Sequence, residues 1–177
     1  MMNFFELIER EGKPVEKPKY GLVFRQGELD QSLYLLRSGL LKAFYTSPDG
    51  KEFIKSFIVP NDIIGSLVSA RNGSGCSFSL ICLEPSTLIR IPFSTIVTYS
   101  KTEPEIADAM MDVLLNFAMK KERREFEFLC LSAEQRFELL VEKDPVILEK
   151  VTQNDIAHYL GITPVALSRI RKRVREK

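Results

Sequence analysis

Histidine and clustered cysteine, the residues that most often build metal and nucleophile sites, are scarce in this sequence. The 177 residues contain one histidine, His158, and three cysteines, Cys76, Cys82 and Cys130, with no CxxC pair. A disulfide framework uses an even number of cysteines, and zinc or iron–sulfur sites use clustered ligands. We therefore expect three reduced cysteines, no metal, no cofactor and no catalytic triad.

Long apolar runs are also missing. No stretch approaches the roughly 18 consecutive apolar residues of a membrane span. The N-terminal residues Met1–Glu6 lack the basic and apolar regions of a secretory signal. The composition, 45% hydrophobic and 28% charged, is that of an ordinary globular protein. We expect a cytoplasmic protein with no membrane partner.

Basic residues are concentrated at the C-terminal end. The formal net charge is only +1, yet the last ten residues, Ser168–Lys177, contain six lysines and arginines and one acid, Glu176. The rest of the chain is therefore net acidic. A basic end on an acidic body favours a polyanionic partner at that end.

Short β-type runs fill the chain from Tyr20 to Ile91, after a short helix expected at Asn3–Glu11. Asp49-Gly50 suits a hairpin turn, because glycine adopts positive φ at little cost. No helical crossover separates the runs, so a parallel sheet is not expected. The pattern predicts an antiparallel β-roll, similar to a jelly roll, as the first part of an α+β fold. The expected strands are Leu22–Phe24, Leu33–Leu36, Leu40–Tyr45, Phe53–Ile58, Ser77–Leu83 and Thr87–Ile91.

A long helix is predicted from Pro104 to about Leu131. Its apolar residues step by four, three and four, which puts them on one helical face. Such a stripe is either intramolecular core or a dimer seam, and periodicity does not distinguish the two. The charged second half, Lys120–Glu127, is expected to be exposed or to lie between domains. The stripe consists of Ile106, Met110, Val113 and Phe117.

Several shorter helices follow the boundary near Leu131. Ser132 and Gln135 form a capping-box pattern at the start of one helix, and Asp144-Pro145 ends that helix or begins a loop. Thr152 is expected to cap the next helix, with the acid Asp155 near its positive dipole end.

The last two of these helices have the spacing of a helix-turn-helix. Gly161 suits a left-handed helix end, and Thr163-Pro164 is a favourable start for the second helix. Leu167, Ile170 and Val174 form its inward face. Two short helices joined by a tight glycine turn are the usual arrangement of this DNA-binding motif.

The outward face of the final helix carries the side chains that can read DNA. Arg169, Ser168 and Val165 are expected to contact bases in the major groove. A second set is expected to contact the DNA backbone. The alternative is that the basic residues only complement the helix dipole, but that needs one or two cations rather than six. The backbone set is Thr152, Thr163, Arg171, Lys172, Arg173 and Arg175.

Residues 15–177 resemble the Crp/Fnr family of bacterial regulators. The glycine-marked turns resemble those of that family's cyclic-nucleotide-binding β-roll, and the run from Thr152 to Ile170 is similar to its helix-turn-helix. The resemblance implies a β-roll sensor, a homodimer formed through the long helix, and a two-fold related DNA site. It favours the dimer seam for the apolar stripe. The β-roll turns are Gly27-Glu28, Leu33-Tyr34-Leu35, Ser38-Gly39 and Asn61-Asp62-Ile63-Ile64-Gly65.

The sensor half departs from the members that bind nucleotides. Those members have a glutamate after the glycine that matches Gly65, where this chain has Ser66, and no arginine stands at the phosphate position in residues 72–77. A buried phosphate without a cation is costly, so we do not expect cyclic AMP, although Arg71 is an alternative cation. Residues 1–75 contain no cysteine and the sensor no histidine, which argues against the iron–sulfur and haem modes. The effector is unknown; its pocket is expected at Gly65, Ser66, Arg71, Cys76 and Ser77.

The DNA-binding half also departs from the family pattern. Arg169 matches the arginine that typically reads guanine, but Pro164 and Val165 stand where arginine and glutamate are frequent. Sequence preference should therefore differ from that of the best-known members. The chain stops at Lys177, so the usual β-wing is expected to be missing or replaced.

These observations predict a homodimeric transcription regulator and not an enzyme. Its expected parts are a sensor at residues 1–103, a dimerisation helix at 104–131 and a helix-turn-helix domain at 132–177. Double-stranded DNA is the expected partner, with RNA polymerase and a small-molecule effector as further candidates. One alternative is a sensor or protein-interaction module that has lost specific DNA binding. Another, a cupin-like metalloenzyme, lacks the histidines that its strands would need.

Overall fold

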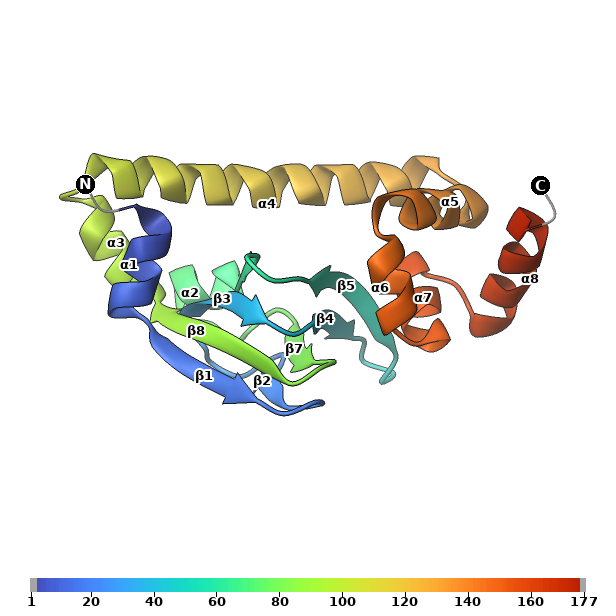
Figure 1. Ribbon diagram of the computed structural model, residues 1–177, viewed down its shortest axis with the longest axis horizontal. Coiled ribbons are helices and arrows are strands. Elements are labelled where there is room, and N and C mark those ends of the chain that lie inside the picture. Colours follow the sequence, from blue (N-terminus) through green and yellow to red (C-terminus); the bar gives the residue numbers. More distant parts are fainter. Residues whose placement is uncertain (1–2, 176–177) are drawn as a thin grey trace.

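Within residues 3–175, which the computed structural model describes, the first half of the chain folds into two four-stranded antiparallel sheets (Figure 1). The sheet orders are β1-β8-β3-β6 and β2-β7-β4-β5. The predicted α+β fold with an antiparallel roll is confirmed. The strands are β1 Lys13–Lys17, β2 Leu22–Phe24, β3 Ser32–Ser38, β4 Leu41–Thr46, β5 Glu52–Ile58, β6 Ile63–Ile64, β7 Ser79–Cys82 and β8 Ser86–Pro92.

Two of these strands, β1 and β6, were not predicted from the sequence. β1 contains Pro14 and pairs only with β8. It is an edge strand, where a missing backbone N–H is tolerated. β6 is two residues long and pairs with β3. Neither strand has the alternating pattern from which strands are recognised.

The hairpin between β4 and β5 contains the predicted glycine turn and an irregularity. Gly50 has φ 82°, as expected for this turn. Ala43 pairs with Ser56, whereas the next residue, Phe44, pairs with Ile54. Lys55 is therefore the extra residue of a β-bulge. A bulge bends the strand and interrupts the regular alternation of side chains between the two faces of the sheet.

The space between the sheets is filled by apolar side chains such as Leu36, Leu41, Leu80 and Leu88, all fully buried. A second cluster lies where the first sheet meets three helices, α1 Phe4–Glu11, α3 Phe93–Ser100 and the first part of α4 Pro104–Cys130. Another helix, α2 Leu67–Asn72, lies between β6 and β7 in the chain.

The second cluster contains residues that were expected to form the dimer seam. Ile106 is fully buried and Met110 is 9% exposed, both against α1 and the first sheet, and Val113 packs on the same cluster. Phe117 is half-buried. The seam assignment of Ile106 and Met110 is therefore wrong. A helical stripe shows that one face is buried, but not which surface covers it.

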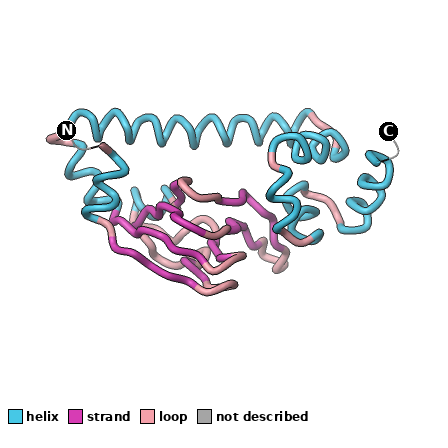
Figure 2. The backbone as a smooth tube through the Cα atoms, in the orientation of Figure 1, coloured by secondary structure: helices cyan, strands magenta, loops and turns pink. Residues whose placement is uncertain are grey.

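Helix α4 runs along the whole molecule and joins its two ends (Figures 1 and 2). Its 27 residues span about 40 Å at 1.5 Å per residue. The predicted bounds are confirmed to within one residue. At its far end four short helices gather: α5 Ala133–Lys143, α6 Pro145–Lys150, α7 Gln153–Leu160 and α8 Pro164–Arg175.

The four C-terminal helices share a core with the β-roll. Leu40 and Leu83 belong to the same buried cluster as Phe137, Ile156 and Leu160. Phe57 of β5 packs against this cluster from the side of the roll. The C-terminal helices are therefore held against the second sheet as well as by the chain connection through α4.

Candidate nucleic-acid interface and sensor pocket

Two capping hydroxyls and one left-handed glycine shape the helix-turn-helix. The Thr152 hydroxyl accepts a hydrogen bond from the backbone N–H of Asp155 at 3.1 Å and caps α7. Gly161 ends that helix with φ 69°. The Thr163 hydroxyl accepts from the backbone N–H of Ala166 at 3.2 Å at the start of α8. The predicted caps and turn are confirmed, because each satisfies backbone groups that a helix end leaves open.

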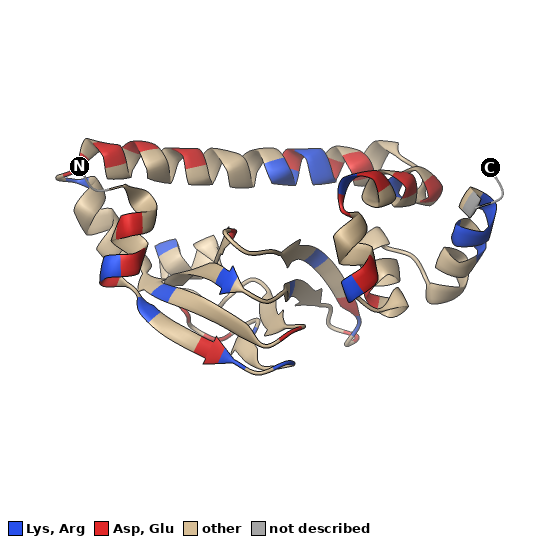
Figure 3. Cartoon of the chain, viewed as in Figure 1, with Lys and Arg blue, Asp and Glu red and all other residues tan. Residues whose placement is uncertain are grey.

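The face of α8 that points away from the core is open. Leu167 and Ile170 are buried as predicted, with 1% and 4% of their surface exposed. Val165, Ser168 and Arg169 are exposed. Figure 3 shows lysine and arginine along this helix at the end of the molecule. An open basic helix of this kind fits a major groove; the base contacts themselves stay a prediction.

The expected phosphate-binding residues are in different states. Lys172 is exposed and forms no ion pair among the described residues. Arg171 donates a hydrogen bond to Gln153 Oε1 of α7. Arg173 Nε lies 3.0 Å from Glu134 Oε2 of α5. Thr152 and Thr163 are used as caps, and the side chain of Arg175 lies outside the described residues.

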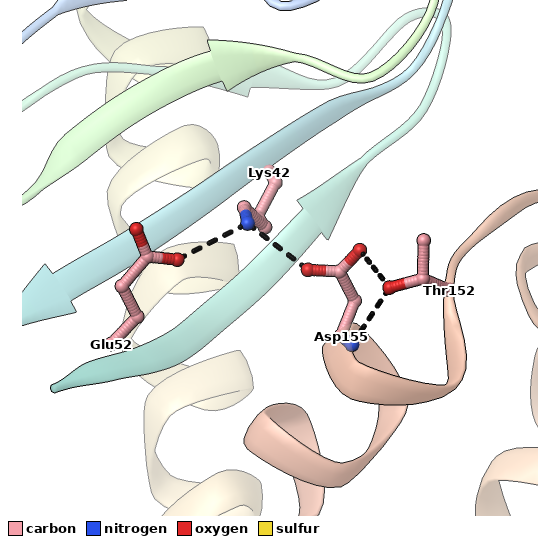
Figure 4. Close-up of polar contacts among 4 residues, drawn as sticks. All are labelled: Lys42, Glu52, Thr152 and Asp155. Carbon is pink, nitrogen blue, oxygen red and sulfur yellow. Dashed lines mark hydrogen bonds and ion pairs between the residues drawn. The ribbon is translucent and has the colours of Figure 1, made fainter.

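Helix α7 is fastened to the β-roll by an ion pair that the sequence did not reveal (Figure 4). Lys42 Nζ of β4 lies 3.0 Å from Asp155 Oδ1 and 3.3 Å from Glu52 Oε2. The Thr152 hydroxyl donates to Asp155 Oδ2 at 2.7 Å. The Lys42 and Asp155 side chains are only 13% and 12% exposed. Sequence reasoning assigned Asp155 to the helix dipole alone, because its partner is 113 residues away.

A second contact between α7 and the roll is aromatic. The rings of Phe57 and Tyr159 lie 5.4 Å apart. The Arg124 guanidinium of α4 stacks 3.7 Å above the Tyr159 ring and donates hydrogen bonds to the carbonyl oxygens of Tyr159 and Ile54. Burial lowers the pKa of Arg124 from its ordinary value. The charged second half of α4 thus lies partly between the two halves of the molecule, as predicted.

Arg136 joins the end of α4 to the helix-turn-helix. Its two terminal nitrogens donate to the Leu131 carbonyl at 2.7 Å and to the Leu160 carbonyl at 3.0 Å. Its guanidinium also lies 4.7 Å from the Phe128 ring centroid. The carbonyls at helix ends lack partners within the helix, so Arg136 satisfies the ends of α4 and α7 together. No local pattern in the sequence marks this role.

The expected effector pocket is partly assembled. Ser66 is buried and caps α2, and its Oγ accepts a hydrogen bond from the Ser77 backbone N–H at 3.1 Å. A Cβ at Gly65 would lie 2.6 Å from the Leu33 side chain, so glycine allows this turn to approach β3 closely. Cys76 is buried beside them. Arg71, in contrast, is exposed.

Aromatic side chains fill the interior next to this turn. The Phe24 ring lies 5.3 Å from Phe78 and 6.0 Å from Tyr34. The Tyr34 hydroxyl donates to Asp30 Oδ2 at 2.7 Å. Burial, followed by this hydrogen bond, raises the pKa of Tyr34. The polar groups here are therefore satisfied by the chain itself.

Metal binding and membrane crossing each require a recognisable arrangement of side chains. Among residues 3–175, no group of three histidine, cysteine or acidic side chains is arranged to hold a metal ion. In the same range, no helix combines the length and the apolar character that crossing a membrane requires.

Residues 15–102 match the cyclic nucleotide-binding domain family. The chain is 30% identical to the anaerobic regulatory protein of Aggregatibacter actinomycetemcomitans, over 93% of this chain and 66% of that protein. It is 27% identical to the transcriptional activator protein Anr of Pseudomonas protegens, over 99% and 75%. The curated relatives are longer: the chain spans 64% of the anaerobic regulatory protein of Pasteurella multocida.

Solved structures share the fold over nearly the whole chain. FixK2 from Bradyrhizobium japonicum superposes with a TM-score of 0.80 at 16% identity, covering 93% of this chain and 85% of that one. The c-di-GMP responsive global regulator CLP of Xanthomonas campestris gives 0.79 at 17% identity, covering 97% and 90%. At these identities the likeness concerns the fold.

Proposed function

Because the chain belongs to the Crp/Fnr family of transcription regulators, we propose that it is a homodimeric DNA-binding regulator whose helix α8 reads the major groove. The observation that carries the proposal is the open outward face of α8. Its base-reading candidates are exposed while the opposite face is anchored in the core. Arg169 is assigned to guanine, Ser168 to either base type and Val165 to a thymine methyl.

Regulators of this family bind DNA as dimers, and α4 has a second apolar face that suits this role. Met111, Leu115 and Met119 step by four and are 57%, 50% and 54% exposed. Phe126 and Leu129 continue the same face by helical spacing. We call Met111, Leu114, Leu115, Met119, Phe126 and Leu129 the seam face; we propose that a second copy of the chain covers it.

The effector is proposed to differ from cyclic AMP. Ser66 replaces the ribose-binding glutamate, its hydroxyl is used within the turn, and Arg71 is exposed. We further propose that the protein acts with RNA polymerase at a promoter in the cytoplasm and that it catalyses no reaction.

The DNA proposal is tested by selecting a duplex from a random-sequence pool and measuring Arg169→Ala on it. Loss of one bidentate guanine contact should weaken specific binding by about 1–3 kcal/mol. Lys172→Ala is the matched control, since loss of a phosphate contact weakens all sequences alike and lowers the salt slope by about one. If Arg169→Ala binds the selected duplex as tightly as the parent, α8 does not read bases through Arg169.

The second candidate is a sensor or interaction module without specific DNA binding. It is favoured by the internal contacts of Arg171 and Arg173. These two side chains were expected to bind DNA phosphates, but they contact Gln153 and Glu134 instead. The same selection separates the two candidates. A pool in which no sequence is enriched would support the second candidate and remove the first.

A further inference from the structure

The β-bulge in β5 places a lysine among aromatic side chains at one end of the roll. Lys55 Nζ lies 5.0 Å from the Phe78 ring centroid. The Tyr45 ring meets the same Phe78 ring edge-on at 6.3 Å. Phe53 is directly opposite Tyr45 across the hairpin, and cross-strand partners share a face. Tyr45, Phe53, Lys55 and Phe78 therefore form one group, which we call the aromatic lysine site.

The charge at this site has no counter-charge. Among the described residues, Lys55 forms no ion pair, and the positive charges of Lys120 and Lys121 of α4 act on it. Of these, Lys120 lies 3.2 Å from Asp62 Oδ1, whereas Lys121 also forms no ion pair in the described part of the chain. Burial, and then the like charges of the two lysines, lower the pKa of Lys55. A partly desolvated cation with like-charged neighbours is unfavourable until an anion joins it.

The aromatic members of the site still face solvent. Tyr45 is 41% and Phe53 is 46% exposed, although both lie beside the buried ring of Phe78. Small-molecule sites are lined mainly by apolar and aromatic side chains, with a few polar groups that orient the ligand. Helix α4 passes close by, since Arg124 donates to the Ile54 carbonyl next to Lys55. A ligand here would contact the sensor and α4 together.

We propose that the aromatic lysine site binds a small aromatic anion. Its carboxylate or phosphate would pair with Lys55, and its ring would pack against Tyr45 and Phe53. The site adjoins the turn at Ser66, because Phe78 directly follows Ser77, whose backbone N–H donates to the Ser66 hydroxyl. That this anion is the effector rests on the proposed regulatory function; the binding itself does not.

The test is thermal unfolding and calorimetric titration of the full chain with benzoate, phenyl phosphate, inorganic phosphate and neutral benzyl alcohol. We expect the two aromatic anions to raise the unfolding temperature at millimolar concentration. Inorganic phosphate should do so less, and benzyl alcohol should not. Lys55→Met should weaken aromatic-anion binding at least tenfold, and Lys55→Arg should retain it.

Lys51→Met is the matched control, because Lys51 lies in the same hairpin but is exposed and paired with Asp49 at 2.8 Å. Equal responses of the parent and Lys55→Met, or no response to either aromatic anion, would overturn the proposal. Binding of the parent protein to the selected DNA duplex is measured in parallel, so that failure of the anion site can be distinguished from failure of the proposed regulatory function. Intact DNA binding without anion binding removes only the site, whereas anion binding without DNA binding removes only the regulator.

Discussion

Lys55 and Asp155 are both largely shielded from water, and they differ in what compensates their charge. The Asp155 carboxylate accepts hydrogen bonds from Lys42 and from the Thr152 hydroxyl. Lys55 has an aromatic ring and two other lysines around it. Burial without a partner disfavours the charged form, so the ionisation of Lys55 opposes folding, whereas that of Asp155 is compensated.

This difference predicts a pH-dependent effect of Lys55→Met. The lowered pKa means that folding favours the neutral amine, so the penalty is fully present below the folded-state pKa. It disappears as the pH rises through that value to the ordinary lysine pKa of 10.5. In anion-free buffer near pH 7, Lys55→Met should unfold about 2–4 °C higher than the parent for each ~1 kcal/mol of penalty removed.

Thermal unfolding of both proteins across this pH range measures the effect. The two unfolding temperatures should converge as the pH approaches 10.5. Because only the difference between the proteins is used, groups such as Tyr34 titrate equally in both. A difference that stays constant with pH would show that charge at Lys55 is not its cause.

At the scale of elements, α4 has two apolar faces with different neighbours. The face with Ile106 and Met110 packs on the sensor core. The seam face around Leu115 is exposed along the far side of the helix. Monomeric proteins rarely expose a long continuous apolar face, which is why the seam face is assigned to a second copy.

A charge in the seam face should therefore separate the protomers. Leu115→Glu would bury a carboxylate at the contact of two helices, which is costly without a partner. We expect a monomer at micromolar concentration by sedimentation, with helix content unchanged by circular dichroism. Asn116→Glu, one residue further along the same helix, should remain dimeric. A dimeric Leu115→Glu protein would place the contact elsewhere.

At the scale of the whole molecule, the sensor and the helix-turn-helix are one packed unit. The cluster of Leu40 and Leu83 with Ile156 crosses between them, and the ion pair of Lys42 with Asp155 closes one side (Figure 4). A ligand or substitution at the roll can therefore act on α7 directly as well as through α4.

A double-mutant cycle on Lys42 and Asp155 should measure this coupling. Either Lys42→Met or Asp155→Asn leaves a largely buried charge with fewer partners and should cost about 1–3 kcal/mol in urea unfolding. The double variant should cost less than the sum, because the second change removes the orphaned group. Lys51→Met, at an exposed ion pair, should leave the midpoint unchanged. Strictly additive effects would mean that the pair contributes no coupling.

Much of the fold follows from local chemistry and could be predicted. Gly50 and Gly161 require positive φ, Thr152 and Thr163 cap helices, and each acts within a few residues along the chain. The strands with clear apolar runs were found for the same reason. β1 was missed because its proline and its edge position give no apolar alternation.

The functional residues also divide into those set by local sequence and those set by contacts between distant segments. The sequence by itself determined which helix is basic and which of its faces is open, because a helical repeat fixes the face of every residue. Only the tertiary structure decided which surface buries Ile106 and that Lys42 holds Asp155. It alone placed Lys55 beside Phe78 without an ion-pair partner among the described residues. Those outcomes depend on contacts between segments far apart in the chain, for which spacing along the sequence contains no signal.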